Sequence, residues 1–427
     1  DKRCIMAIEL KKNVRLTVLP TKKYKTIRIF IRFTSQLAAE TAAKRTLLTS
    51  LLETTSLRYP TQTAFSTQLA ELYGASFGMN VNKKGDLHQV NAAMSFVNGK
   101  YVADEELFTQ AVSFLKEVLF FPNIVQDEFE SKNFTIEKSN LIAYMRSIAE
   151  DKQAFASLSL QELFFSKSDN QKFPSFGRPE DLEDVTAKEL TETYSSMIKE
   201  DAVDIFVIGD VEEDQVIEVM KDLPFENRPE KDLSVFYRQD LENIIREKIV
   251  REPVTQAKLN LGYRTGVYYN QPERFSLMVF NGLFGGFPHS KLFMNVREKE
   301  SLAYYASSNV DTFRGYLSVQ TGIDGSNRDQ VFTLIEQQLQ SLQRGEITEA
   351  ELAQTKAMLK NQFLLSLDSP QSLIETEYLN QWVPNTKMSE EQFIQRLEEV
   401  SVTDVQKIAQ KIELQAVFFL DKELDHE

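Results

Sequence analysis

The most informative stretch of this sequence runs from Asn281 to Ser308 and reads NGLFGGFPHSKLFMNVREKESLAYYASS. Its paired glycines suggest a phosphate-binding loop, but the G-x-x-x-x-G-K-[ST] order of such loops is missing. A nucleotide site is therefore not expected. The plainest interpretation is a tight turn, with Ser290 as the N-cap of a helix from Lys291 to Glu298. His289 has no Ser or Cys partner that the sequence identifies, and reads as a surface residue.

The residues that follow predict a helix and then a strand. Leu292, Phe293 and Val296 fall on one helical face, and the charged run 297–300 is typical of a solvated helix end. Ala303 to Ser308 has strand character. Without further context, Arg297 is expected to form a surface ion pair. Tyr304 is expected to be an amphipathic side chain, with an apolar ring and a polar tip, in the wall of the fold.

Outward from this stretch, the two halves of the chain match each other at a shift of about 220 residues. Strand-like runs recur, helices with similar openings recur, and each half ends on a helix followed by an apolar strand. Thr348 is an expected N-cap with Glu351 as its capping-box partner. The matched segments are 26–33 with 258–263, 124–129 with 347–352, 185–190 with 402–407, and 203–208 with 417–420.

This pattern predicts an α+β fold of two homologous domains, each a mostly antiparallel sheet with helices packed on it. We expect an N-terminal domain over residues 1–222 and a C-terminal domain over residues 251–427. The segment 223–250 is charged and carries prolines in its first part, which favours a linker.

Composition narrows the function classes. The 427 residues carry 49 Lys and Arg against 63 Asp and Glu, a formal charge of -14, which argues against nucleic acid and anionic membranes as partners. No apolar run approaches the roughly 20 residues of a membrane span, and the first residues lack a signal-peptide pattern. The single cysteine, Cys4, excludes a disulfide framework and favours a cytoplasmic location.

Histidine is scarce. Only His88, His289 and His426 occur, and no two are spaced as a zinc-binding pair. We therefore expect no metal site in this chain and no self-contained histidine-zinc hydrolase.

Residues 285–304 nevertheless resemble a known family. Gly285-Gly286, the run 290–293, the run 296–299 and the run 301–304 together resemble the second-domain signature of the pitrilysin/insulinase family of zinc metallopeptidases, which includes the mitochondrial processing peptidases. Segments 345–356 and 68–75 resemble further helices of that family, so the likeness spans nearly the whole chain.

The resemblance implies that the two domains form half of a clam shell, whose peptide chamber a second half completes. Family members that bind zinc carry H-x-x-E-H on a helix of the first domain, with a distant glutamate. The matching region here, Lys44 to Glu53, has no histidine. Glu137 falls near the distant glutamate, but one carboxylate without imidazoles cannot hold catalytic zinc, so it reads as a remaining polar helix residue.

The sequence does contain residues that match a second part of the family's catalytic site. Arg297 and Tyr304 match the arginine and tyrosine that, in the family, reach across the chamber to the substrate carbonyl near the zinc of the opposite domain. A guanidinium and a phenol placed there would stabilise the oxyanion. The resemblance thus implies a subunit without zinc that supplies Arg297 and Tyr304 in trans to a homologous, zinc-bearing partner.

The implied substrate is a peptide or an unfolded polypeptide segment. The loop residues Gly285, Gly286, Phe287, His289 and Ser290 are candidates for binding it at the chamber mouth. A second hypothesis from another class is a catalytically inactive scaffold of the same fold, which would form a homodimer. In that case Arg297 and Tyr304 would be remnants.

Overall fold

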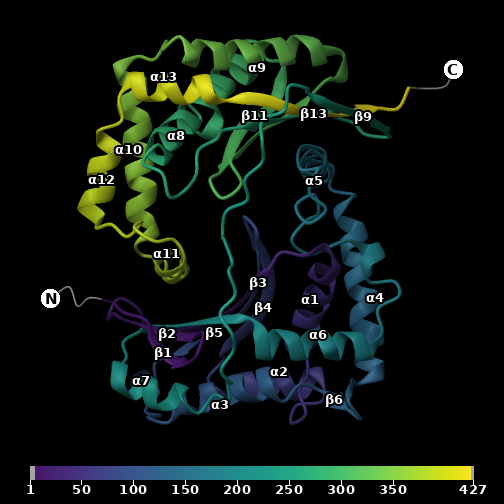
Figure 1. The fold of residues 1–427 in the computed structure, drawn as a ribbon, viewed down its shortest axis with the longest axis vertical. Coiled ribbons are helices and arrows are strands. Elements are labelled where there is room, and N and C mark those ends of the chain that lie inside the picture. Colours follow the sequence, from purple (N-terminus) through teal and green to yellow (C-terminus); the bar gives the residue numbers. More distant parts are fainter. Residues whose placement is uncertain (1–4, 425–427) are drawn as a thin grey trace. The chain divides into compact units, whose positions relative to one another are not determined.

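A computed structural model describes residues 5–424, in which the chain forms two compact units. Unit 1 comprises the described residues up to Ser147 together with Pro174–Ser234, and unit 2 comprises Ile148–Phe173 and the described residues from Val235 onward. Cys4 and His426 lie outside the described range. Figure 1 shows both units as sheets with helices packed against them.

Unit 1 is built on a six-stranded sheet in the order β1-β2-β8-β3-β5-β4. The β2–β8 pair is parallel and the other pairs are antiparallel. Central strand β3 is long and apolar, and it pairs residue for residue with β5, with Ile31 opposite Ala92. The strands are β1 (Ile8–Lys11), β2 (Val14–Pro20), β3 (Thr26–Gln36), β4 (Ser76–Lys84), β5 (Leu87–Val97) and β8 (Ala202–Gly209), with a separate hairpin of β6 (Ile124–Val125) and β7 (Glu128–Phe129).

The helices of unit 1 pack on the sheet through one large apolar cluster, which includes Leu47 and Leu51 of α1 and Leu115 of α3. Side-chain caps fix where several of them begin: Thr186 accepts from the Glu189 amide in a capping box at the start of α6. The helices are α1 (Ala39–Leu52), α2 (Gln62–Glu71), α3 (Leu107–Phe120), α4 (Ser131–Ile148), α6 (Ala187–Glu200) and α7 (Glu213–Met220).

Unit 2 has a five-stranded sheet in the order β11-β12-β10-β13-β9. Only the β9–β13 pair is parallel. Its strands are β9 (Arg246–Glu252), β10 (Lys258–Arg264), β11 (Ala303–Asp311), β12 (Tyr316–Ile323) and β13 (Glu413–Lys422). Its helices are α5 (Lys152–Phe164), α8 (Arg274–Asn281), α9 (Arg328–Gln343), α10 (Glu349–Ser366), α11 (Pro370–Trp382), α12 (Glu390–Glu398) and α13 (Val402–Lys411), with π-helical turns at Gly282–Gly286 and Leu292–Lys299.

Helices cover both faces of the unit 2 sheet. Along β13, Val417 and Phe419 belong to the core formed with α8, α9 and α13, whereas Ala416, Phe418 and Leu420 pack with α5. Alternate residues of a strand point to opposite faces, so α5 lies on the face opposite to those three helices. Gly262 of β10 permits this close approach, because a Cβ there would lie 3.0 Å from Cδ2 of Phe164 on α5.

The two sheets share one topology, which confirms the predicted duplication. In chain order β2, β3, β4, β5 and β8 of unit 1 correspond to β9, β10, β11, β12 and β13 of unit 2. Their spatial orders, β2-β8-β3-β5-β4 and β9-β13-β10-β12-β11, agree strand for strand, including the position of the single parallel pair. The predicted α+β class is therefore correct.

Most of the predicted elements are present, but one helix start is wrong. Thr348 caps α10 by accepting from the Glu351 amide, but the Glu351 side chain does not complete the predicted capping box. The strands predicted at 26–33, 203–208, 258–263 and 417–420 are all present. The segment 124–129, however, forms the β6–β7 hairpin, and α4 begins only at Ser131. Gln126 and Asp127 both have positive φ, a turn conformation that a continuous helix cannot contain.

The unit boundaries differ from the expected 1–222, 223–250 and 251–427 in two respects. Residues 148–173, with α5, belong to unit 2. The segment 223–250 is not a free linker along its whole length: Leu223 and Phe225 are buried in the unit 1 core, and β9 begins at Arg246. Arg228 also fixes this segment, since its amide donates to the Lys12 carbonyl. Periodicity and proline content do not report such contacts.

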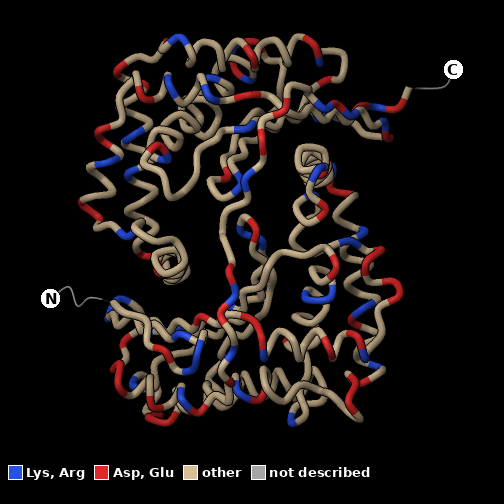
Figure 2. The backbone as a smooth tube through the Cα atoms, viewed as in Figure 1, with Lys and Arg blue, Asp and Glu red and all other residues tan. Residues whose placement is uncertain are grey.

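Acidic and basic residues are interspersed along both units (Figure 2). The excess of acidic residues is thus spread over the chain rather than confined to one segment. No helix among residues 5–424 is long and apolar enough to cross a membrane.

We expect Gly262→Val to destabilise unit 2, because the new side chain would meet Phe164, which packs in a cluster with the rings of Phe165 and Tyr316. The expected loss is about 1–3 kcal/mol. Gly78→Val on β4 is the matched control, since a Cβ there meets no atom within 4 Å. Urea unfolding of the two variants checks this, and equal midpoints would contradict close packing at residue 262.

Candidate functional site

The Gly-rich stretch of unit 2 adopts two π-helical turns, at Gly282–Gly286 and Leu292–Lys299. Because π-helical geometry is rare and occurs frequently at functional sites, its presence here singles out this stretch. The sequence predicted an ordinary helix from Lys291. Ser290 is fully buried and its hydroxyl accepts from the Phe293 amide at 3.3 Å, so the expected capping role of Ser290 is present.

Gly285 is buried where the loop touches strand β11. A Cβ at this position would lie 2.6 Å from Oγ and 2.7 Å from the amide nitrogen of Ser308. Glycine is therefore required for the loop to approach the strand. Gly286 is exposed, so of the two paired glycines only this one presents its backbone to solvent.

Phe287 and His289 form a small stacked pair. Their rings lie 5.7 Å apart, with an interplanar angle of 18°, and Phe287 is buried. His289 Nε2 lies 2.7 Å from Oγ1 of Thr355 on α10, and Nδ1 is buried without a partner among the described residues. Burial lowers the pKa of His289, opposed by the charge of Glu351. His289 thus stays neutral at pH 7 and links the loop to α10.

Arg297 lies in the second π-helical turn and is 41% exposed. Its guanidinium carbon lies 4.5 Å from the centroid of the Phe293 ring, and Nε is 3.8 Å from the carboxylate of Glu298. An ion pair at that distance is a weak one at an exposed site. The guanidinium is therefore available to an incoming anionic or carbonyl group.

Tyr304 lies at the start of β11, the outermost strand on one side of the sheet, and is 64% exposed. Ala303 pairs with Ile323 while Tyr305 pairs with Gly322, so Tyr304 is the extra residue of a β-bulge. Ser301, with φ of 53°, turns the chain just before it. Tyr304 lines an open hollow of about 520 Å³ with Asp324 and Asp421, which Arg297 does not line.

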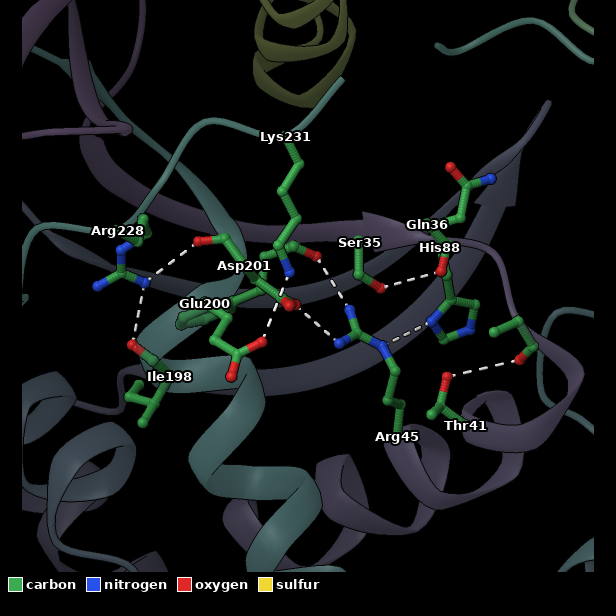
Figure 3. A network of polar contacts seen from close by, with 12 residues as sticks. Ser35, Gln36, Thr41, Arg45, His88, Ile198, Glu200, Asp201, Arg228 and Lys231 are labelled. Atoms are coloured by element: carbon green, nitrogen blue, oxygen red, sulfur yellow. Dashed lines mark hydrogen bonds and ion pairs between the residues drawn. The ribbon is translucent and has the colours of Figure 1, made fainter. Parts of the chain in front are cut away.

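In unit 1, the helix that matches the family's zinc-binding region is α1, and its buried side carries Arg45 (Figure 3). Arg45 is 4% exposed. Its Nη1 donates to Asp201 at 2.7 Å, its Nε donates to Nδ1 of His88 at 2.8 Å, and its Nη2 contacts the Phe33 carbonyl at 3.4 Å. Charge and hydrogen bonds of the guanidinium are thus satisfied inside the unit.

The same contacts fix the state of His88. Since the arginine Nε can only donate, Nδ1 of His88 must be the acceptor, and Nε2–H donates to the Ser175 carbonyl at 2.8 Å. Burial and the charge of Arg45 lower the pKa of His88 to about 3. Burial raises the pKa of Asp201, although Arg45 opposes this shift. His88 is therefore a neutral acceptor, already committed to Arg45.

Arg228 extends this network from the segment after unit 1's last helix. It is 1% exposed, and its Nη1 donates to the carbonyls of Ile198 and Asp201 at 2.9 and 3.2 Å. These are the last carbonyls of α6, which a cation near the helix C-terminus stabilises.

The acidic groups nearby do not make a zinc site. Burial raises the pKa of Glu53, the hydrogen bond from the Met79 amide opposes that shift, and the charge of Glu137 adds to it. Burial also raises the pKa of Glu137 on α4. No group of three His, Cys, Asp or Glu side chains among residues 5–424 is placed to hold a metal ion. The residues of this chain do not fit the family's zinc.

Sequence reasoning missed the Arg45 network. The local sequence gives little signal, because Arg45 follows another cation, Lys44, and either of them could lie on the solvated face of the helix. The partners His88 and Asp201 lie 43 and 156 residues away, beyond the reach of any local pattern.

Comparisons with known proteins agree on one family. Residues 184–359 match the family model described as Peptidase M16 inactive domain. A Bacillus subtilis protein named probable inactive metalloprotease YmfF is 35% identical over 407 residues, which is 94% of each chain. A zinc protease of the same organism, YmxG, is 31% identical over 171 residues, 39% of this chain and 41% of YmxG.

Solved structures extend the likeness. A conserved protein from Enterococcus faecalis V583 matches with a TM-score of 0.96 at 52% identity, over 99% of this chain and 100% of that one. A protease from Helicobacter pylori matches with a TM-score of 0.79 at 16% identity, over 98% and 99% of the two chains, which shows the fold alone.

Gly285→Ala should destabilise the loop, since the added methyl group would collide with the backbone of Ser308. We expect a loss of about 1–3 kcal/mol in urea unfolding. At Gly286 the nearest atoms to a Cβ are 3.0 and 3.1 Å away, so Gly286→Ala is a control with a smaller expected loss. A larger effect of Gly286→Ala would contradict the packing described.

His88 predicts a pH dependence of stability. Its pKa is about 3 in the folded chain and ordinarily 6.5, so between those values the unfolded chain binds a proton that the folded chain does not. The contribution of neutral His88 to the free energy of unfolding is therefore lost progressively as the pH falls below 6.5. From pH 7 to pH 5 the wild type should lose about 2 kcal/mol more unfolding free energy than His88→Gln, which keeps an acceptor for Arg45. Parallel losses in urea titrations at both pH values would refute this.

Proposed function

The chain belongs to the pitrilysin/insulinase (M16) family of metallopeptidases, and we propose that it is the zinc-less subunit of a two-chain peptidase. In this proposal a homologous partner binds zinc, and this chain supplies Arg297 and Tyr304 in trans at the partner's site. The complex acts in the cytoplasm. Peptides or unfolded polypeptide segments are its substrates.

The observation that carries the proposal is the exposure of this pair. Tyr304 is 64% exposed and Arg297 is 41% exposed. Among the described residues, the one polar contact of the Arg297 side chain is the 3.8 Å approach to Glu298. A bulge turns Tyr304 out of the strand pairing. Neither side chain is needed to hold unit 2 together, which supports a role toward a ligand.

The side-chain contacts of α1 in unit 1 also support a peptidase in which two chains supply different parts of the site. Its α1 helix uses Arg45 in a closed network with Asp201 and His88, so it offers no open ligand position. In this proposal the zinc chemistry comes from another chain. The relative YmfF is likewise named a probable inactive metalloprotease.

The chemistry assigned to this chain is charge stabilisation. Attack on a peptide carbonyl builds negative charge on its oxygen, and a zinc ion in the partner would supply the chemistry that activates the attacking water. Arg297 and Tyr304 donate hydrogen bonds to that oxygen, and a preplaced donor contributes more to the transition state than to the ground state. The substrate would lie along β11, with the exposed backbone of Gly286 at one end of the loop.

Arg297→Ala and Tyr304→Phe, each combined with the zinc-bearing homologue from the same genome, should cleave a fluorogenic peptide about a hundredfold more slowly, the usual effect of removing one oxyanion donor. Unfolding free energies should change by less than about 0.5 kcal/mol, because both side chains are exposed.

Arg344→Ala is the matched control, since Arg344 is an exposed arginine of unit 2 paired with Glu346. Its complex should cleave at the wild-type rate. Equal rates for all variants would refute the role in trans. A stable homodimer that binds no zinc-bearing homologue would instead favour the scaffold hypothesis.

A further inference from the structure

Unit 2 contains a second cavity that the proposed function does not use. It has a volume of about 460 Å³ and lies among α8, α10, α11, α12 and the loop between β11 and β12. Its volume falls within the roughly 300–1,000 Å³ of small-molecule sites. The apolar lining includes Tyr269, Phe313, Phe363, Phe393, Met278 and Met388.

Aromatic pairs make the walls of this cavity rigid. The rings of Phe363 and Phe393 stack with centroids 3.9 Å apart, and those of Tyr269 and Phe313 stack at 5.3 Å. The pairs come from different segments of unit 2, so the walls are fixed by contacts across the fold. The cavity is therefore preformed.

One cation lines this apolar space. Arg274, the first residue of α8, is only 7% exposed. Its guanidinium carbon lies 4.0 Å from the Tyr269 ring centroid, Nη1 donates to the Tyr269 carbonyl at 3.0 Å, and Nη2 lies 3.8 Å from the Met388 sulfur. The sulfur is a weak acceptor.

The charge of Arg274 has no acidic partner within 4.0 Å among residues 5–424, in contrast to buried Arg45. Glu390 also lines the cavity, but it is exposed and makes no ion pair with Arg274. A guanidinium has five N–H donors, and two are used here. A buried cation is ordinarily paired. The remaining N–H donors of Arg274 thus have no acceptor, and its positive charge has no acidic partner, among residues 5–424 at the wall of this apolar cavity.

We propose that this cavity binds an apolar group that ends in a carboxylate, with the carboxylate on Arg274 and the apolar part between the aromatic walls. A planar guanidinium matches a carboxylate with two parallel hydrogen bonds, which a hydroxyl or an amide cannot reproduce. Free fatty acids and the C-terminus of a peptide that ends in an apolar residue both have this chemistry.

Calorimetric titration of the full chain tests this with two probe pairs: octanoate against octan-1-ol, and acetyl-Ala-Leu-Leu against its C-terminal amide. At least one carboxylate should bind about tenfold more tightly than its uncharged analogue, the usual effect of a charge-assisted hydrogen bond. Tighter binding of octanoate assigns the cavity to fatty acids, and tighter binding of the peptide assigns it to peptide termini.

Two variants locate the binding. Arg274→Leu should abolish the preference for carboxylate. Ser372→Phe fills the cavity while Arg274 stays, and the Ser372 hydroxyl makes no hydrogen bond among the described residues. This variant should therefore weaken the binding of all probes about tenfold or more. Arg396→Leu is the control, because Arg396 is exposed and does not line the cavity.

Three results would overturn the proposal: equal binding of charged and uncharged probes, no saturable binding of either carboxylate, or unchanged affinity in Ser372→Phe. If Arg274→Leu does not fold, the wild-type probe comparison and Ser372→Phe still decide. Peptide cleavage with the zinc-bearing homologue is not a readout here, so the outcome is independent of the roles of Arg297 and Tyr304.

Discussion

A guanidinium inside a protein needs an opposite charge or hydrogen-bond acceptors to replace the water that it has lost, and several elements of unit 1 meet this need at Arg45. Helix α1 brings the cation, β5 brings the neutral His88, and the end of α6 brings Asp201. Arg228 then closes the end of α6 with two further hydrogen bonds. Removing any one partner would leave a buried charge or donor unmatched, so these elements are bound to one another by electrostatics as well as by the apolar core.

The two units show how one topology carries two different arrangements of polar side chains. Both sheets follow the same strand order. The helical segment that follows β3 in unit 1 nevertheless differs from the one that follows β10 in unit 2. In unit 1 it is a regular α-helix whose polar groups are internally satisfied. In unit 2 it is interrupted by π-helical turns and followed by a bulge, and it leaves Arg297 and Tyr304 at the surface. The fold sets the scaffold, whereas local irregularities set which side chains face outward.

Much of the architecture could be predicted because its signals are local. The apolar runs of β3, β8, β10 and β13 and the cap at Thr348 are short-range patterns. The β6–β7 hairpin was missed because its apolar residues also fit a helix start, and only the positive φ values at 126 and 127 exclude it. Of the candidate site, Arg297 and Tyr304 came from a family likeness. The partners of Arg45 and the surroundings of Arg274 depend on contacts between distant segments, which periodicity cannot report.

The placement of α5 has a consequence for how the chain is made. Residues 148–173 leave the ribosome long before the strands they cover, since α5 packs on β10 and on β13, the last strand. During synthesis at about 5–20 residues per second, the apolar side of α5 waits several seconds or more for its partners. When Phe164 and Leu160 emerge, unit 1 still lacks α6 and its central strand β8. Unit 2 can therefore close only after β13 has left the ribosome, long after α5.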